Sequence, residues 1–346
     1  MDDIVFFYPR GHEAHNESGH PERPERVEAI RQALLEIGWW ERYPMLPSIE
    51  LSRELLERVH SPTYLDNLKN ACSHGSRLDM DTYTTPASWQ LALDAAGGAA
   101  AVGRAVWEGK SQRGLALTRP PGHHATINRG MGFCLLNNVA LAAEYLVNVS
   151  DSQIPEAQKL AIIDLDLHHG NGTQEIFWRR GDVLYISTHQ SPFYPGTGYL
   201  DEIGVGPGKR CTANFPLPPY TGDHGFIEVM ETLILPLLDR FSPQMLLVSM
   251  GFDPHWRDPL GNLLLSAEGF GNLIKSLTCW TDQNCSGKIA LFLEGGYDLE
   301  AGKACILAAV AALLKQPWDD ALGSSPHPEG SSWKVVVRNA RQIWNV

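Results

Sequence analysis

The sequence predicts an α/β protein: a single domain whose mostly parallel central sheet is flanked by helices on both faces. Short apolar runs rich in β-branched residues alternate with amphipathic or alanine-rich segments of helical length, as in strands joined by crossover helices. Polar clusters follow several of these runs, and ligands of such sheets bind beyond the carboxyl ends of the strands. Because we find no linker, repeat or low-complexity segment, we take residues 1–346 as one domain.

The composition excludes several classes of protein. A chain of 346 residues with 43% hydrophobic residues can bury a large core without a disulfide framework. A formal net charge of -12 argues against general nucleic-acid binding, which requires clustered Lys and Arg. No signal peptide or membrane-spanning apolar run is present, and the six cysteines are scattered without a Cys-x-x-Cys. We therefore expect a cytoplasmic protein with reduced thiols.

The elements follow from the hydrophobic pattern in chain order. Strands are expected at the apolar runs 4–8, 115–118, 160–163, 183–187, 244–249 and 289–293. Helices are expected at 25–37, 51–60, 62–71, 87–107, 133–147, 171–178, 226–241, 267–280 and 301–314. A valine-rich segment at 335–337 is expected to be an edge strand. The Gly97-Gly98 pair inside a long helix indicates close packing against a neighbour, because glycine destabilises an exposed helix.

The stretch 160–173 is the one around which the other polar clusters are arranged. Side chains two residues apart on an extended segment point to the same side, so Asp164, Asp166 and His168 can converge. Carboxylate and imidazole groups on one face of a strand end form a plausible half of a metal site. A single Asp-x-His would more often be a hydrogen-bonded turn, but further polar clusters follow the other strands.

Asp253 follows a different apolar run and could complete the metal site. With Asp166 and His168 it would supply two oxygens and one nitrogen, leaving a coordination position open for water and substrate. Such a site suits a catalytic ion better than a structural one. Taken alone, Asp253 before Pro254 would be interpreted as a turn or helix-cap residue.

Two adjacent histidines, His123 and His124, follow a Pro-Pro-Gly turn at another strand end. Imidazoles have pKa values near working pH, so the pair could act as base and acid. Asp164 and Asn171 could each orient one of them. Because a neutral amide raises the pKa of histidine less than a carboxylate does, the two imidazoles could differ in protonation. The alternative is two surface histidines.

Tyr297 follows Gly295-Gly296, a pair of glycines that allows a sharp turn. A phenol swung into a cleft can donate a hydrogen bond to a developing oxyanion. The aromatic residues Phe133, Phe193 and Tyr194 lie in loops at the same edge and could line a slot for a slim alkyl chain. The alternatives are an ordinary glycine turn and simply packed aromatics.

Several stretches, in this order along the chain, resemble the zinc-dependent histone deacetylase superfamily, which has the arginase-type α/β fold. They are 20–26, 119–124, 132–138, 164–173, 193–198, 251–253 and 294–297. Asn171, Leu260 and the phrase 255–259 are similar to the class II and prokaryotic branch. That branch includes bacterial histone deacetylase-like amidohydrolases and acetylpolyamine amidohydrolases.

The resemblance implies amide hydrolysis with one catalytic zinc ion on Asp166, His168 and Asp253. It further implies that His124 is the main base and acid, that His123 with Asp164 gives electrostatic support, and that Tyr297 binds the oxyanion. Substrate would be contacted by Phe133 and Tyr194 along an acyl-lysine tunnel, by Leu260, by Gly132 at the substrate amide and by Asp81 at the rim. Arg26 would face an acetate exit, and a structural potassium ion is expected at Asp164, Asp166, His168 and Ser187. Tyr194 departs from the phenylalanine that is usual in the family.

The leading hypothesis is a zinc-dependent hydrolase that removes acetyl or related acyl groups from lysine side chains or similar N-acylated amines. An alternative is acetylpolyamine hydrolysis, for which Glu13, Glu17, Asp79 and Asp81 are candidate acidic groups at the mouth. A non-catalytic binding module would not need the acid–base pair, and a di-metal hydrolase would need ligands that we cannot assign. The sequence leaves open the acyl carrier, the oligomeric state, and zinc versus ferrous iron.

Overall fold

A fully parallel eight-stranded sheet lies at the centre of the computed structural model, which describes residues 2–149 and 158–346. Its strand order is β2-β1-β3-β8-β7-β4-β5-β6. The strands are β1 (Asp2–Phe7), β2 (Met45–Leu46), β3 (Ser111–Ala116), β4 (Leu160–Asp164), β5 (Val183–Gln190), β6 (Thr212–Leu217), β7 (Met245–Met250) and β8 (Ile289–Leu293). In the register of β4, Asp164 lies opposite Ser249 of β7 and Ser187 of β5.

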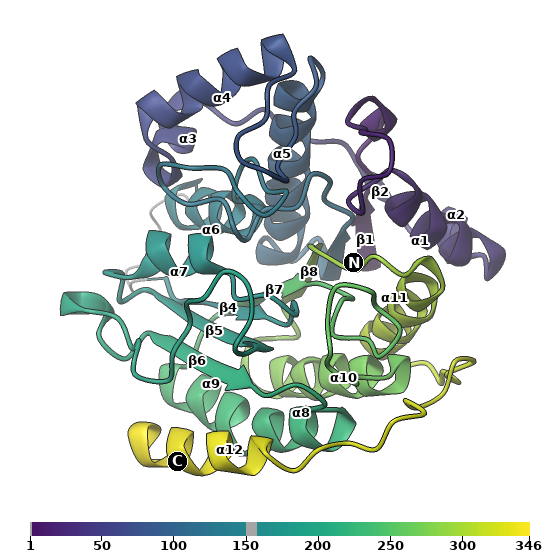
Figure 1. The fold of residues 1–346 in the computed structure, drawn as a ribbon, viewed down its shortest axis with the longest axis vertical. Helices are drawn as coiled ribbons and strands as arrows, with labels where there is room; N and C mark the ends of the chain where they lie inside the picture. Colours follow the sequence, from purple (N-terminus) through teal and green to yellow (C-terminus); the bar gives the residue numbers. More distant parts are fainter. Residues whose placement is uncertain (1, 150–157) are drawn as a thin grey trace.

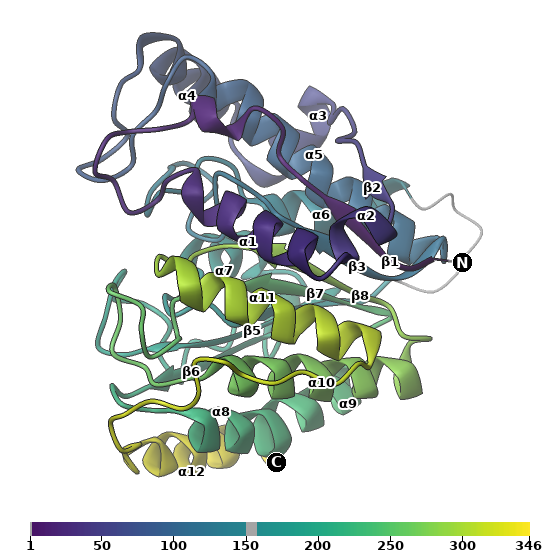
Figure 2. The same ribbon diagram turned by 90° about the vertical axis from the view of Figure 1, so that its right-hand side faces the viewer.

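Helices cover both faces of the sheet (Figures 1 and 2). One face carries α3 (Arg53–Val59), α4 (Pro62–His74), α5 (Ser88–Trp107), α6 (Asn138–Val149) and α7 (Asn171–Phe177). The other carries α1 (Glu25–Glu36), α2 (Trp39–Arg42), α8 (Asp223–Val229), a π-helical turn (Met230–Ile234), α9 (Leu235–Phe241), α10 (Ala267–Asn284), α11 (Leu299–Leu314) and α12 (Trp333–Trp344). Within residues 2–149 and 158–346, none of the helices combines the length and the apolar character of a membrane-spanning segment.

Alternating side chains of each strand fill two separate cores, one under each layer of helices. In β4, Ala161 and Ile163 pack into the core beneath α1 and α8–α12, while Leu160 and Ile162 pack into the core beneath α3–α7. This two-sided burial is why the strands read as continuous apolar runs. The predicted close packing of α5 is confirmed, because a Cβ at Gly98 would collide with the ring of Phe7.

Three expectations about the elements were wrong. Residues 335–337 belong to helix α12, whose Trp333, Val337 and Trp344 are buried at helical spacing in the core beneath α1 and α8–α12. Helix α6 begins at Asn138 rather than at 133, because Phe133 has φ 70° and the Asn137 side chain accepts the N–H of Ala140. The segment 226–241 is two α-helices joined by a π-helical turn.

Candidate active site

Asp166, His168 and Asp253 converge just beyond the carboxyl ends of β4 and β7. His168 Nδ1 lies 3.1 Å from Asp166 Oδ1 and 3.1 Å from Asp253 Oδ2. Both carboxylates are buried, and backbone N–H groups orient them: Leu167 donates to Asp253 Oδ1 at 3.0 Å and Gly295 donates to Asp166 Oδ2 at 2.9 Å. Three donor atoms from two segments of chain are thus brought to one point.

This donor set fits a divalent metal ion. Two carboxylates buried side by side repel each other, and burial together with the Asp166 charge raises the pKa of Asp253. A divalent cation between them would offset that repulsion. Glycines make the room: a Cβ at Gly251 would collide with the Asp166 carboxylate, and one at Gly295 with that of Asp253. Two oxygens and one imidazole nitrogen are ligands typical of catalytic metal sites.

His123 is held by a carboxylate through its side chain. Its Nδ1–H donates to Asp164 Oδ2 at 3.1 Å, and Tyr185 Oη donates to the same oxygen at 3.1 Å. Burial alone would lower the pKa of His123, but the carboxylates of Asp166 and Asp164 outweigh burial and raise it well above the usual value. His123 is therefore set up to carry a positive charge.

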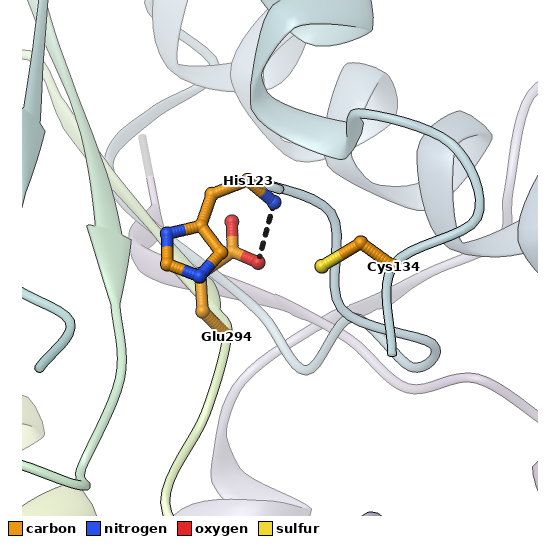
Figure 3. Close-up of side chains that lie close together, drawn as sticks. All are labelled: His123, Cys134 and Glu294. Atoms are coloured by element: carbon orange, nitrogen blue, oxygen red, sulfur yellow. Dashed lines mark hydrogen bonds between the residues drawn. The ribbon is translucent and has the colours of Figure 1, made fainter. Parts of the chain in front are cut away.

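Glu294, at the end of β8, holds the backbone of the same turn, a role that was not predicted from the sequence. Its Oε2 accepts the N–H groups of Gly122 at 2.7 Å and His123 at 3.1 Å, and its Oε1 accepts the hydroxyl of Ser249 at 2.9 Å. Figure 3 shows this carboxylate beside His123 with the Cys134 thiol facing both. Burial raises the pKa of the Cys134 thiol well above its usual value. Because the Glu294 oxygens are already bonded, we interpret this trio as scaffold.

His124 has a neutral partner. Its Nδ1–H donates to Asn171 Oδ1 at 2.8 Å, and its ring centroid lies 4.1 Å from that of His123. Burial, reinforced by the charges of His123 and His168, lowers the pKa of His124 well below the usual value. The pairings expected from the sequence are both present, and the two imidazoles differ in their tendency to hold a proton.

The turn that carries Tyr297 is fixed by the carboxylate of Asp258. Gly296 has φ 108°, which favours glycine. Asp258 Oδ2 accepts the N–H groups of Tyr297 at 2.6 Å and Asp298 at 3.2 Å, and Oδ1 accepts that of Leu260 at 2.9 Å. Burial and the neighbouring Asp253 raise the pKa of Asp258 to about 7.

Arg26 stabilises the turn before Tyr297 through hydrogen bonds to its backbone. Its guanidinium donates to the carbonyl oxygens of Gly296 at 2.5 Å and Glu294 at 2.6 Å, and it lies 4.8 Å from the centre of the Tyr297 ring. Burial raises the pKa of Tyr297 well above its usual value, so the phenol keeps its proton and remains a donor.

A cavity of about 430 Å³ leads from the surface to these groups. Its lining includes His123, His124, His168 and Tyr297 at the site and Gly132, Phe133, Phe193, Tyr194, Leu260 and Asp81 towards the mouth. Tyr194 lies edge-on to His124, with centroids 5.2 Å apart, and Phe133 lies edge-on to Tyr297 at 5.8 Å. The five residues expected to contact substrate therefore line the same cavity as the two histidines and Tyr297; they are Gly132, Phe133, Tyr194, Leu260 and Asp81.

Six expected residues lie outside the cavity lining, and two of them, Asp166 and Asp253, contact it through His168. Asp164, Asn171 and Arg26 contact it through His123, His124 and Tyr297 respectively. Ser187 is buried in β5 beside Asp164, and its hydroxyl lies 2.9 Å from His189 Nδ1. The potassium site expected around Ser187 stays a prediction.

A buried charge network behind the site was not predicted. Glu22, fully buried, accepts from Arg119 Nε at 2.7 Å and from Arg26 Nη1 at 3.1 Å. Burial opposes ionisation, but the charges of Arg119 and Arg26 outweigh it and lower the pKa of Glu22 to about 2. Both partners lie in stretches singled out in the sequence, yet Glu22 and Arg119 are 97 residues apart, and no local pattern reveals their pairing.

Comparison with known proteins gives a consistent result. The family described as "Histone deacetylase domain" matches residues 20–313. A probable deacetylase from Archaeoglobus fulgidus is 40% identical over 283 residues, covering 81% of this chain and 77% of that protein. A histone deacetylase-like amidohydrolase from Pseudomonas aeruginosa is 34% identical over 298 residues, covering 86% and 77%.

A solved structure also resembles this chain in its fold. The crystal structure of the HDA15 HD domain superposes with a TM-score of 0.88 at 32% sequence identity, covering 99% of this chain and 95% of that one. The chain belongs to the histone deacetylase family, as the order of its motifs and the geometry of its site indicate.

Proposed function

We propose that this protein is a zinc-dependent amidohydrolase that removes acetyl groups from lysine side chains, acting through residues 1–346 as one catalytic domain. One observation carries the proposal: an imidazole pair of unequal pKa, a protonated phenol and His168 line a single cavity, and His168 converges there with the buried carboxylates of Asp166 and Asp253. The proposal is also supported by two of the relatives, a probable deacetylase and a histone deacetylase-like amidohydrolase. We propose zinc as the ion because histidine and aspartate are among its usual ligands in catalytic sites.

The residues of the chain divide the reaction between them. Bound zinc, held by Asp166, His168 and Asp253, would polarise the scissile carbonyl and acidify the attacking water. Neutral His124, oriented by Asn171, accepts a proton from that water as its oxygen bonds to the carbonyl carbon. Tyr297 donates a hydrogen bond to the carbonyl oxygen as negative charge develops there.

The second half of the reaction returns that proton. His124 delivers it to the amine nitrogen as the C–N bond breaks, which gives the free amine and acetic acid, and the acid then loses its proton to solvent as acetate. His123, charged beside Asp164, stabilises negative charge in the site without giving up its proton. Arg26, at the far side of Tyr297, faces the path by which we expect acetate to leave.

The cavity suits an extended acyl-lysine side chain. Phe133, Phe193 and Tyr194 offer aromatic walls to the methylene groups, which bury well against apolar surface. We assign Gly132 to the substrate amide, Leu260 to the cavity wall and Asp81, exposed at the rim, to the backbone of a substrate peptide. Potassium at Asp164, Asp166, His168 and Ser187 is part of the proposal, as is a cytoplasmic location.

The experiment is hydrolysis of a matched panel by zinc-loaded protein: an acetyl-lysine peptide, longer acyl-lysine peptides, acetylputrescine and acetylspermidine, each with and without a hydroxamate. We expect turnover of the acetyl-lysine peptide that the hydroxamate blocks. Turnover of the polyamines alone would replace this proposal with the acetylpolyamine amidohydrolase alternative. No turnover with zinc bound would favour a binding module.

A further inference from the structure

The mouth of the cavity contains one strongly basic side chain. Among the lining residues in the described part of the chain, Arg77 is the single Lys or Arg, and Asp81 is the single carboxylate. Both belong to the loop that follows α4, together with Met80, whose side chain is 93% exposed. An incoming substrate therefore passes the charges of Arg77 and Asp81 before it reaches the aromatic walls of the cavity.

Arg77 joins two segments across the mouth. Its Nη2 pairs with Glu17 Oε1 of the N-terminal loop, and its Nη1 donates to the carbonyl oxygen of Met80 at 2.8 Å. Asp79 Oδ1 accepts the N–H groups of Asp81 at 3.1 Å and Thr82 at 2.6 Å, which fixes the shape of the loop. Arg77 thus lines the cavity while it pairs with a carboxylate that lies beside the mouth.

Carboxylates at the mouth would attract a cationic amine. Asp81 lines the cavity, while Asp79 and Glu17 lie beside it, Asp79 accepting the N–H of Asp81 and Glu17 pairing with Arg77. Of these three negative charges, Arg77 offsets that of Glu17 by direct contact. An acylated polyamine carries ammonium groups a few methylenes from its amide, whereas an acetyl-lysine in a peptide presents neutral backbone there. Charges that are half exposed act over about 8–10 Å at ordinary salt, far enough to act on such an ammonium group.

We infer that Arg77 is a specificity-determining residue: by pairing with Glu17 it disfavours cationic acylated amines and leaves acyl-lysine in a neutral peptide setting as the preferred substrate class. The inference rests on the proposed amide hydrolysis and makes it more specific. It explains why the acidic group at Glu17, a candidate polyamine contact in the sequence, does not leave a free carboxylate at the mouth.

The test measures a ratio. The kcat/KM for acetylspermidine is divided by that for a neutral, capped acetyl-lysine peptide, using zinc-loaded protein at low and high salt. Arg77→Gln keeps a donor for the Met80 carbonyl and removes the charge, so the ratio should rise by about 2- to 5-fold at low salt, the scale of one half-exposed charge. The increase should shrink at high salt because the charges are screened.

Two further variants make the result specific. Glu17→Gln leaves Arg77 unpaired and should lower the ratio, while the double variant should return towards the parent value. Arg53→Gln is the matched control, since Arg53 is also exposed and paired with carboxylates, on α3. An unchanged ratio in Arg77→Gln and Glu17→Gln, with both substrates turned over, would overturn this inference alone. Hydrolysis of neither substrate by the parent would overturn the proposed function and this inference with it.

Discussion

The Nδ1 atom of His124 lies 2.8 Å from the amide oxygen of Asn171, whereas the adjacent His123 points its Nδ1 at the carboxylate of Asp164, 3.1 Å away. Two neighbouring imidazoles thus have partners of different charge. The pKa of His123 is raised well above its usual value and that of His124 is lowered well below. A proton acceptor and a fixed positive charge can therefore coexist in one site at neutral pH.

Replacing that neutral partner should move the pH profile. In Asn171→Asp, a carboxylate beside His124 would raise the pKa of this imidazole, because it favours the charged form. Since the base must be unprotonated, the acidic limb of kcat/KM should shift to higher pH by about one unit. Asn128→Asp adds the same charge to an exposed loop and should leave the limb in place. An unmoved limb in Asn171→Asp would contradict the role of His124.

Removing the phenol should separate catalysis from metal binding. Tyr297→Phe loses the donor to the developing oxyanion, so turnover should fall by about 10²- to 10³-fold. Bound zinc, measured by metal analysis, should stay the same, because Tyr297 is not among the three donors. Tyr199→Phe, an exposed tyrosine, serves as control. Normal turnover in Tyr297→Phe would show that the oxyanion assignment is wrong.

Loss of the Asp258 carboxylate should lower kcat more than it lowers the stability of the fold. Asp258→Ala removes the acceptor of three backbone N–H groups, including that of Tyr297, so kcat should fall on the order of tenfold to a hundredfold as the phenol loses its position. Asp258→Asn keeps one carbonyl acceptor and should be intermediate.

The control for Asp258 is Asp320→Ala. Asp320 accepts the backbone N–H groups of Glu268, Leu322 and Gly323, away from the cavity. Its loss should lower the thermal midpoint while kcat stays near the parent value. If both variants lose stability and neither loses rate, Asp258 is structural and does not position Tyr297.

A buried histidine should make stability depend on pH. His60 donates to Thr126 O and accepts the N–H of Asn137, and burial lowers its pKa from 6.5 to about 4. As pH falls, the unfolded chain takes up this proton first. The free energy of unfolding is therefore unaffected by titration of His60 above pH 6.5. It falls as the pH drops from 6.5 to about 4, by a total of about 3 kcal/mol.

Chemical denaturation across this pH range is the measurement. His60→Gln retains a donor and an acceptor without the titration, so its free energy of unfolding should fall less steeply between pH 6.5 and 4. Identical slopes for the parent and His60→Gln would show that His60 does not titrate as its burial implies.

Features that depend on a local residue pattern could be predicted from the sequence. The central strand at 160–163 and the convergence of Asp166 and His168 follow from continuous apolar residues and a period of two, and both are present in the structure. Strand β6 was missed because Thr212, Asn214 and Pro216 break the apolar run. Such a strand is tolerated at the edge of the sheet, where β6 lies.

The remaining misses involve tertiary contacts. The β-branched run at 335–337 favours a strand by local propensity, but burial of Trp333 and Trp344 on one face of α12 overrides it. Glu22 and Arg119 meet only once the sheet has brought distant loops together. Likewise, the pairing of Glu17 with Arg77, which changes the interpretation of the mouth, cannot be inferred from their separate positions in the sequence.

Metal-dependent release of acetate is the most direct test of the central claim. Protein stripped with a chelator, then reloaded with one equivalent of zinc, would be given an acetyl-lysine peptide, and free acetate and free lysine would be quantified. We predict no release by the stripped protein, stoichiometric acetate and amine after zinc is restored, and neither zinc binding nor release in Asp253→Ala. Equal release by stripped and reloaded protein, or by Asp253→Ala, would contradict the assignment of Asp166, His168 and Asp253 as the catalytic metal site.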